Sequence, residues 1–261
     1  MWDPAAYLRF TDHRSRPFAD LLARAAVADP AVVVDLGCGP GTLTVHLADR
    51  WPGAVVTGID SSTEMIAAAR ALGSPVRFDV GDVTDWEPGP DVDVVICNAV
   101  LQWVPEHPAL LDRWAARLRP GAVLAFQVPG NFDAPSHRAI RSVAADARWR
   151  GRLPDIRGGD VVLDPAGYAT RLLRAGCTVD AWESTYLHLL PAVDADPAAH
   201  PVLAWVEGTA ARPVRAALDD AGWAAFRRRL GEELAARYPV RDGLVAFPFR
   251  RVFVVATKPA G

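Results

Sequence analysis

Residues 32–41 read VVVDLGCGPG, a short β-branched run that ends in an acidic residue and three glycines spaced two apart. The run predicts a buried strand, and the glycines predict a sharp turn into a helix over residues 41–50. Without Cβ atoms, glycines let a ligand approach the backbone, and the following helix offers free N–H groups. The spacing is G-x-G-x-G. A dinucleotide-binding loop reads G-x-G-x-x-G, so a nicotinamide dehydrogenase is disfavoured.

The same alternation of apolar runs and helical segments continues along residues 30–130. Apolar strands separated by helices predict a parallel sheet covered on both faces. The chain is therefore expected to be an α/β protein. Strands are expected at 32–34, 55–60, 76–80, 92–97 and 122–128, and helices at 41–50, 62–72 and 108–118.

The regions outside this core follow a different pattern. A helix over residues 5–27, interrupted near Pro17, is expected at the N-terminus. Long strands are expected at 177–190 and 249–257, and the stretch between them is long enough to need helices of its own. The predicted division is an N-terminal helical segment that covers the site (1–30), an α/β core (31–190), a helical cap insertion (191–245) and a final core strand (246–261).

Composition limits the classes of function. The 261 residues carry a net charge of −3, which argues against a non-specific nucleic-acid binder. No apolar run approaches the roughly 18 residues of a membrane helix. The three cysteines fit neither zinc nor disulfide spacing, so a reduced, cytoplasmic setting and no bound metal are expected. A monomer or weak dimer without membrane or nucleic-acid partners is the expectation.

Polar residues follow the predicted strands where each strand ends. Asp60 ends the second strand, Asp82 follows the third, and Asn98 follows the fourth. An acid at the second position can accept both ribose hydroxyls, although it could also cap the next helix, a role that Ser62 can fill. Asp82 could be an ordinary turn residue. Because the carboxyl ends of parallel strands meet at one edge of a sheet, a shared ligand explains these residues together.

This constellation resembles the S-adenosylmethionine site of class I methyltransferases. The resemblance covers residues 30–130. It implies a Rossmann-like, seven-stranded sheet with an antiparallel last strand and a helical cap inserted before it. It also implies that the cofactor is bound by Asp35, Gly37, Cys38, Gly39 and Gly41 at its methionine end, by Asp60 at its ribose, by Asp82 and Val83 at its adenine, and by Asn98, Ala99 and Trp103 beside the sulfonium. Ser61, next to Asp60, is a further predicted cofactor-binding residue.

A closer resemblance, to the trans-aconitate 2-methyltransferase family, extends over almost the whole chain. It implies transfer of a methyl group to a carboxylate of trans-aconitate, giving a monomethyl ester. The matching stretches include Trp2-Asp3-Pro4, Arg14-Ser15-Arg16-Pro17, Asp35 to Gly41, Gly58 to Ser62, Leu101-Gln102-Trp103, Gln127-Val128-Pro129, Thr185-Tyr186, Arg212-Pro213 and Ala246-Phe247-Pro248.

Arginines suit a substrate that carries several carboxylates, because each can pair with a carboxylate through two N–H groups. The predicted topology gathers arginines, a tyrosine and a histidine at the ligand edge. Arg250 and Arg251 are neighbours on a strand, so at most one is expected to face the ligand. An ionised carboxylate needs no base, so no catalytic residue is predicted. The predicted substrate-binding residues are Arg14, Tyr186, His188, Arg212, Arg250 and Arg251, of which Tyr186 and His188 could instead be ordinary sheet residues.

Two alternatives remain open at this point. The enzyme could methylate another small acid or a phenol; a phenol would need a base, for which His188 is the candidate. The chain could also be a non-catalytic module that binds S-adenosylmethionine. The intact glycine loop and the polar residues expected at the sulfonium argue against the second alternative.

Overall fold

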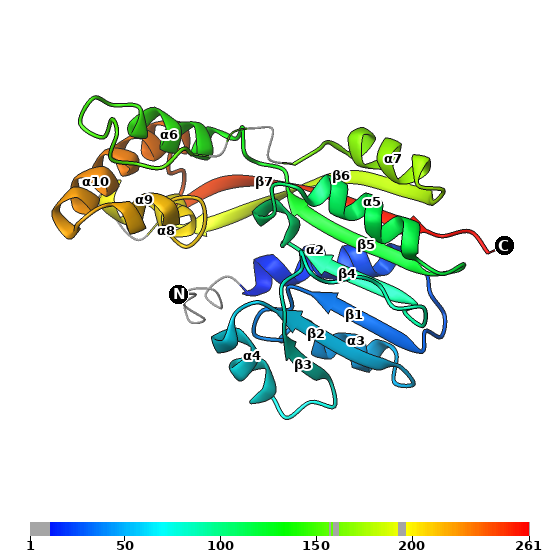
Figure 1. The fold of residues 1–261 in the computed structure, drawn as a ribbon. Coiled ribbons are helices and arrows are strands. Elements are labelled where there is room, and N and C mark those ends of the chain that lie inside the picture. The colour runs from blue at the N-terminus through cyan, green and yellow to red at the C-terminus, as the bar shows by residue number, and fades with distance from the viewer. Residues whose placement is uncertain (1–10, 157, 159–161, 193–196, 261) are drawn as a thin grey trace. The chain divides into compact units, whose positions relative to one another are not determined.

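The structure is a computed structural model that describes residues 11–156, 158, 162–192 and 197–260, with the backbone alone for residues 11–14. Within this part, seven strands form one sheet in the order β3-β2-β1-β4-β5-β7-β6 (Figure 1). Their bounds are β1 (Val32–Leu36), β2 (Val55–Asp60), β3 (Arg77–Val80), β4 (Val94–Asn98), β5 (Val123–Pro129), β6 (Thr178–Pro191) and β7 (Leu244–Thr257).

The pairing of the strands is mixed. β1, β2, β3, β4 and β5 pair in parallel, and β7 pairs antiparallel with β5 from Val123↔Thr257 to Pro129↔Arg251. β1 lies between β2 and β4, so the chain order reverses beside it. The carboxyl ends of β1, β2, β3 and β4 therefore lie along one edge, where open α/β sheets bind ligands. The predicted α/β class and the antiparallel last strand are confirmed.

Helices cover both faces of the sheet (Figure 1). On one face, α5 and α7 pack over a core in which Trp114 and Tyr168 are fully buried. On the other face, α2 packs on β5, α3 packs on β2, and α4 packs on β2 and β3. Outside the gaps given above, the helices are too short or too polar to span a bilayer. The helix bounds are α2 (Thr11–Arg24), α3 (Val45–Arg50), α4 (Thr63–Arg70), α5 (His107–Arg117) and α7 (Pro165–Arg174).

The predicted interruption of the first helix is wrong, because α2 continues through Pro17. Proline removes one backbone donor and disfavours a helix interior. Phe18, Leu21, Leu22 and Ala25 are nevertheless all buried, at the spacing that forms one helical face. Burial of this apolar face stabilises the helix by more than the missing hydrogen bond costs, since each buried large side chain contributes about 1.5–3 kcal/mol.

The chain divides into two compact units. The first comprises the described residues up to Pro129, Val162–Ser184 and the chain from Arg251 onward. The second comprises the described residues of Gly130–Val161 and Thr185–Arg250. β6 and β7 each contribute residues to both units. The division predicted from sequence, with boundaries after residues 30, 190 and 245, stays a prediction.

The second unit is mostly helical. α10 packs on α6, α8 and η3, so closely that a Cβ at Gly231 would lie 2.3 Å from the carbonyl oxygen of Pro197. Its core is aromatic: the His188 ring stacks on Trp205 with 4.9 Å between centroids, and Phe247 packs edge-on against Trp205. The bounds are α6 (Pro135–Ala144), the short 3-10 helix η3 (Pro197–Ala199), α8 (Pro201–Glu207), α9 (Arg212–Ala217) and α10 (Asp220–Arg237).

Lys258, the single lysine of the chain, ties two helix ends together. Its Nζ donates to the carbonyl oxygens of Ala115 at 3.1 Å and Ala175 at 3.0 Å. These carbonyls lie in the last turn of α5 and just after α7, where backbone acceptors lack intrahelical partners and the helix dipole favours a cation. The ammonium group therefore stabilises both helix ends at once.

Replacing Lys258 by methionine keeps the apolar stem of the side chain and removes both hydrogen bonds. We expect Lys258→Met to lower the free energy of unfolding by about 1.5–3 kcal/mol, the scale of a hydrogen bond to a charged group. Urea denaturation measures the change. Arg228→Met, at an exposed position of α10, is the control and should change the free energy of unfolding by less than about 0.5 kcal/mol. Equal effects of the two substitutions would contradict this role for Lys258.

Candidate functional site

The loop after β1 is shaped by its three glycines. Gly37, Gly39 and Gly41 have φ values of 71°, 56° and 75°, a region that residues with side chains rarely adopt. A Cβ at Gly37 would lie 2.0 Å from Cγ2 of Val100, and one at Gly41 would lie 2.7 Å from Cζ of Phe78. A Cβ at Gly39 would meet no atom within 4 Å. The loop therefore packs tightly at its two outer glycines and presents open backbone at the middle one.

The carboxylate of Asp60 ties this loop to the start of α4. Its Oδ2 accepts from the N–H of Gly39 at 2.9 Å, and its Oδ1 accepts from the N–H of Ser62 at 2.9 Å. The Ser62 hydroxyl accepts from the N–H of Met65 at 3.2 Å, which confirms that Ser62 caps the helix. Each carboxylate oxygen keeps a further lone pair, so Asp60 can also accept hydrogen bonds from a ligand.

A cavity of about 370 Å³ opens beside these residues at the carboxyl ends of the parallel strands. This volume is in the range of small-molecule sites. In the described part of the chain, no three His, Cys, Asp or Glu side chains gather as a metal site would need. The cavity is lined by Gly37, Gly39, Pro40, Asp60, Ser61, Met65, Gly81, Asp82, Val83, Thr84, Asn98, Ala99, Val100, Trp103, Val104, Pro105 and Glu106.

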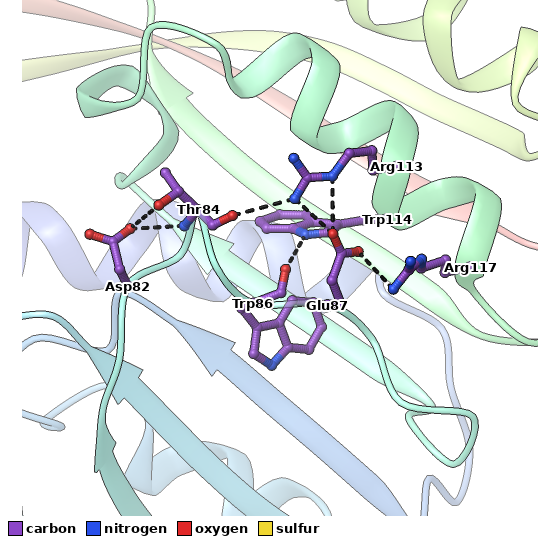
Figure 2. Close-up of polar contacts among 7 residues, drawn as sticks. All are labelled: Asp82, Thr84, Trp86, Glu87, Arg113, Trp114 and Arg117. Carbon is purple, nitrogen blue, oxygen red and sulfur yellow. Dashed lines mark hydrogen bonds and ion pairs between the residues drawn. The ribbon is translucent and has the colours of Figure 1, made fainter.

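Asp82 and Val83 contribute the turn after β3 to this lining. Oδ1 of Asp82 accepts from the N–H of Thr84 at 2.8 Å and from its hydroxyl at 2.7 Å (Figure 2). These hydrogen bonds favour the charged form, so the pKa of Asp82 lies below its usual value. Both contacts use Oδ1, which leaves the lone pairs of Oδ2 for a donor on a ligand.

The same turn is fastened to α5 by a set of polar contacts (Figure 2). Arg113 donates to the carbonyl oxygen of Thr84 at 3.3 Å, and its Nη2 donates to Oε1 of Glu87 at 2.7 Å. Nε1 of Trp114 donates to the carbonyl oxygen of Trp86 at 3.0 Å. The turn is therefore held at successive points, which keeps Asp82 and Val83 in place before a ligand arrives.

The turn after β4 is held from both sides. Ala99 has a φ of 59°, unfavourable for a residue with a side chain. Its N–H donates to the carbonyl oxygen of Gln127 at 2.9 Å, and its carbonyl oxygen accepts from Nε2 of Gln102 at 2.6 Å. Oδ1 of Asn98 accepts from Nε2 of Gln127 at 2.6 Å. Trp103, in the short 3-10 helix η1 (Leu101–Trp103), is 39% exposed and lines the cavity together with Asn98 and Ala99.

Three predicted cofactor residues, Asp35, Cys38 and Gly41, are not among the described residues that line the cavity. Asp35 is buried on β1, where its Oδ2 accepts from the hydroxyl of Thr44 at 2.6 Å. Burial raises the pKa of Asp35 to about 7; the Thr44 hydrogen bond opposes this rise, and the nearby charge of Asp60 adds to it. Cofactor contacts by these three residues stay predictions.

The predicted substrate residues do not all belong to the same compact unit. Tyr186 and His188, on β6, and Arg212, the first residue of α9, lie in the second unit. Tyr186 and His188 are buried there. Arg14 lies in α2, but its side chain falls outside the described residues. Substrate binding by these four residues stays a prediction.

Arg250 and Arg251 point to different partners, as neighbouring residues on a strand do. Nη1 of Arg250 donates to the carbonyl oxygen of Gly130 at 2.9 Å. Arg251 is 5% exposed, and its Nη1 donates to Oε1 of Gln127 at 3.1 Å. Arg251 is thereby linked, through Gln127, to cavity-lining Asn98. Substrate contact by either arginine stays a prediction.

Several lining residues were missed by the sequence analysis. Met65 lies in the first turn of α4, and its position three residues after the cap Ser62 is a signal that could have identified it. Val104, Pro105 and Glu106 line the cavity from the loop after η1. Val104 and Pro105 carry no polar side-chain group, and the carboxylate of Glu106 does not directly follow a predicted strand, so the sequence held no comparable signal for them.

Comparison with known proteins identifies the family. The sequence profile of the methyltransferase domain family matches residues 10–181. A trans-aconitate 2-methyltransferase of Mycolicibacterium gilvum (strain PYR-GCK) is 58% identical over 98% of each chain. One of Rhodococcus jostii (strain RHA1) is 55% identical over 98% of this chain and 99% of that chain. The chain belongs to the trans-aconitate 2-methyltransferase family. Family membership confirms the predicted methyltransferase class and, with it, S-adenosylmethionine as the cofactor.

Solved structures with low sequence identity agree on the fold alone. The YcgJ protein of Bacillus subtilis has a TM-score of 0.59 at 14% identity, covering 95% of this chain and 100% of that chain. The plantazolicin methyltransferase BamL, solved with a desmethyl-plantazolicin analogue and SAH, has a TM-score of 0.53 at 15% identity, covering 98% of this chain and 90% of that chain. The predicted class I methyltransferase fold is confirmed.

Gly39 offers a test of the cavity with a matched control. Gly39 and Gly121 both have positive φ, and a Cβ at either would meet no atom within 4 Å. Substitution by alanine should therefore destabilise the protein to a similar extent at both positions, by about 1–2 kcal/mol of backbone strain. Only Gly39 lines the cavity, so Gly39→Ala should weaken S-adenosylmethionine binding about tenfold or more, as a lost contact of about 1.4 kcal/mol would. Isothermal titration measures the affinity, and an equal loss in Gly121→Ala would contradict the assignment.

The raised pKa of Asp35 makes stability depend on pH. In the folded protein Asp35 keeps a proton that the unfolded chain releases above about pH 4, its usual value being 3.8. Its stabilising contribution is therefore complete below about pH 4 and is lost as pH rises to about 7. Asp35→Asn stays neutral throughout.

The free energy of unfolding of the wild type, minus that of Asp35→Asn, should accordingly fall across this window by up to about 4 kcal/mol. Chemical denaturation in a series of buffers from acid to neutral pH measures this difference. A difference that stays constant with pH would contradict the account of Asp35.

Proposed function

We propose that this protein transfers the methyl group of S-adenosylmethionine to a carboxylate of trans-aconitate, giving a monomethyl ester. The observation that carries the proposal is the cavity lined by polar groups from four successive strand ends, in a chain whose relatives are named trans-aconitate 2-methyltransferase. Relatives with this name are 51–59% identical to the chain.

The residues that line the cavity at each strand end suit the part of the cofactor that was predicted to bind there. Asp60 has lone pairs for ribose hydroxyls, and Asp82, with a lowered pKa, has an oxygen for the exocyclic N–H of adenine. Gly39 presents open backbone to the methionine end, and Asn98 and Trp103 line the same space. When bound, S-adenosylmethionine supplies an electrophilic methyl group on a positively charged sulfur.

The residues of this chain then have to orient the nucleophile and exclude water. Orientation alone can lower a barrier by roughly 7–11 kcal/mol. A carboxylate is already ionised at neutral pH, so no side chain has to remove a proton. The turn after β4 and Trp103 supply a wall for the reacting groups, and the hydrogen bonds of Gln127 and Gln102 keep that turn in place.

The carboxylates that do not react need compensation, since unpaired buried charges cost several kcal/mol. We assign this role to Arg212 and to one of Arg250 and Arg251, with hydrogen bonds from Tyr186 and His188. The expected setting is the cytoplasm, with a small acid as the partner and no nucleic acid. A monomer or weak dimer is proposed. The three cysteines, all free and buried, and the negative net charge support this setting.

Turnover of methyl-labelled S-adenosylmethionine over a panel of small acids and phenols tests the proposal. We expect the highest kcat/KM with trans-aconitate and a product that is base-labile, as an ester is. A higher kcat/KM with a phenol would show that the nucleophile is protonated in the free substrate and is not a carboxylate. Absence of turnover with the whole panel, while S-adenosylmethionine binds, would favour a non-catalytic binding module.

Arg212 tests how the substrate is held. Arg212→Leu should raise KM for trans-aconitate about 10–100-fold, as expected for the loss of charged hydrogen bonds. The fall in kcat should be smaller, because the non-reacting carboxylates keep their charge through the transition state. Affinity for S-adenosylmethionine should not change. Arg228→Leu, at an exposed position of α10, is the control; an unchanged KM in Arg212→Leu would remove Arg212 from the substrate site.

A further inference from the structure

A buried polar chain runs from β7 through β5 to the cavity. Nη1 of Arg251 donates to Oε1 of Gln127 at 3.1 Å, and Nε2 of Gln127 donates to Oδ1 of Asn98 at 2.6 Å. Arg251 and Gln127 are 5% and 1% exposed, whereas Asn98 lines the cavity. The three residues come from adjacent strands of the sheet and share one face, since Gln127 pairs with Asn98 in register and Arg251 pairs two residues further along.

The chemistry of arginine sets the direction of the whole chain. A guanidinium group has donors and no acceptor, so the atom of Gln127 that faces it has to be the carbonyl oxygen. The amide nitrogen of Gln127 then faces Asn98, and only an oxygen of Asn98 can accept from it. Asn98 is left with its NH2 group as the donor for other partners. The orientation of two side-chain amides thus follows from one buried positive charge.

Gln127 also holds the backbone at this point. Its carbonyl oxygen accepts from the N–H of Ala99 at 2.9 Å, so one residue fixes both the side chain of Asn98 and the strained turn that follows it. Rotation of the Asn98 amide would break the hydrogen bond to Gln127 and place two N–H groups face to face. An unmade hydrogen bond at a buried polar group costs about 1–3 kcal/mol, which keeps one orientation dominant.

We propose that Arg251 is a positioning residue that, through Gln127, fixes the amide of Asn98 so that its NH2 group donates to a carboxylate in the cavity. The inference rests on the proposed function, which brings two carboxylates to this place: that of the methionine part of the cofactor and the reacting one of the substrate. A donor from a neutral amide suits either group, since it binds an anion without adding a charge.

The variant Gln127→Glu reverses the polarity of the chain. A glutamate can accept from Arg251 and from the NH2 of Asn98, so Asn98 should turn its oxygen toward the cavity. We expect the affinity for S-adenosylhomocysteine to fall about tenfold or more, by isothermal titration. The affinity for 5′-methylthioadenosine, which lacks the amino-acid part, should change less than about twofold, because that ligand has no carboxylate.

We call the chain of hydrogen bonds from Arg251 through Gln127 to Asn98 the relay. A double-mutant cycle with Asn98→Ala separates the effect of the relay on affinity from the effect of the added negative charge. With no amide at position 98, Gln127→Glu should cause no further loss of affinity, because there is nothing left to orient. A general effect of the negative charge would be the same in both backgrounds and would overturn the proposal. Gln127→Met repeats the cycle without an added charge, and serves if Gln127→Glu does not fold.

The two sources of the carboxylate are distinguished by which constant changes. A loss of S-adenosylhomocysteine affinity assigns the cofactor carboxylate, whereas a raised KM for trans-aconitate at unchanged cofactor affinity assigns the substrate carboxylate. If neither constant changes by more than about twofold, the relay is wrong. Turnover of trans-aconitate by the wild-type protein tests the proposed function separately, so the two can fail independently.

Discussion

Between β1 and the turn after β4 there is no space for a side chain at position 37, where a Cβ would lie 2.0 Å from Val100. This close approach places the glycine loop directly beside Asn98 and Ala99. From the same loop, the N–H of Gly39 reaches the carboxylate of Asp60 at the end of β2. The ends of three neighbouring strands are thus held by one turn, and at its middle glycine, Gly39, the backbone is open to the cavity.

The polar groups around the cavity are ordered by the protein itself. Asp60 holds backbone N–H groups, Asp82 is held by Thr84, and Asn98 is held by Gln127. Each group therefore loses little conformational freedom when a ligand binds, and less of the binding free energy is spent on ordering it. Hydrogen bonds between the turn after β3 and α5 extend this order beyond the residues that line the cavity (Figure 2).

The sheet could be predicted closely because its signals are local. β2 was expected at residues 55–60 and occurs at Val55–Asp60, where β-branched residues precede a helix cap. Pro17 misled the prediction for α2, because a proline signals a break locally while burial of Phe18 and Leu21 is a tertiary effect. β7 begins at Leu244, five residues before its expected start, because its first part alternates exposed and buried residues in place of the continuous apolar run that follows.

The sequence by itself determined the glycine loop, the acids and amide at the strand ends, and the family, because these depend on residue type and spacing. Only the tertiary structure decided what those side chains contact. Asp35 carries the same carboxylate as Asp60, yet it bonds to Thr44 inside the first unit and does not line the cavity. Arg251, one of two neighbouring arginines of which at most one was expected to face a ligand, donates to Gln127, because the register of β5 and β7 places it on the face of the sheet that Gln127 and Asn98 share. Arg251 and Gln127 are 124 positions apart, and spacing along the chain carries no information about such a pairing.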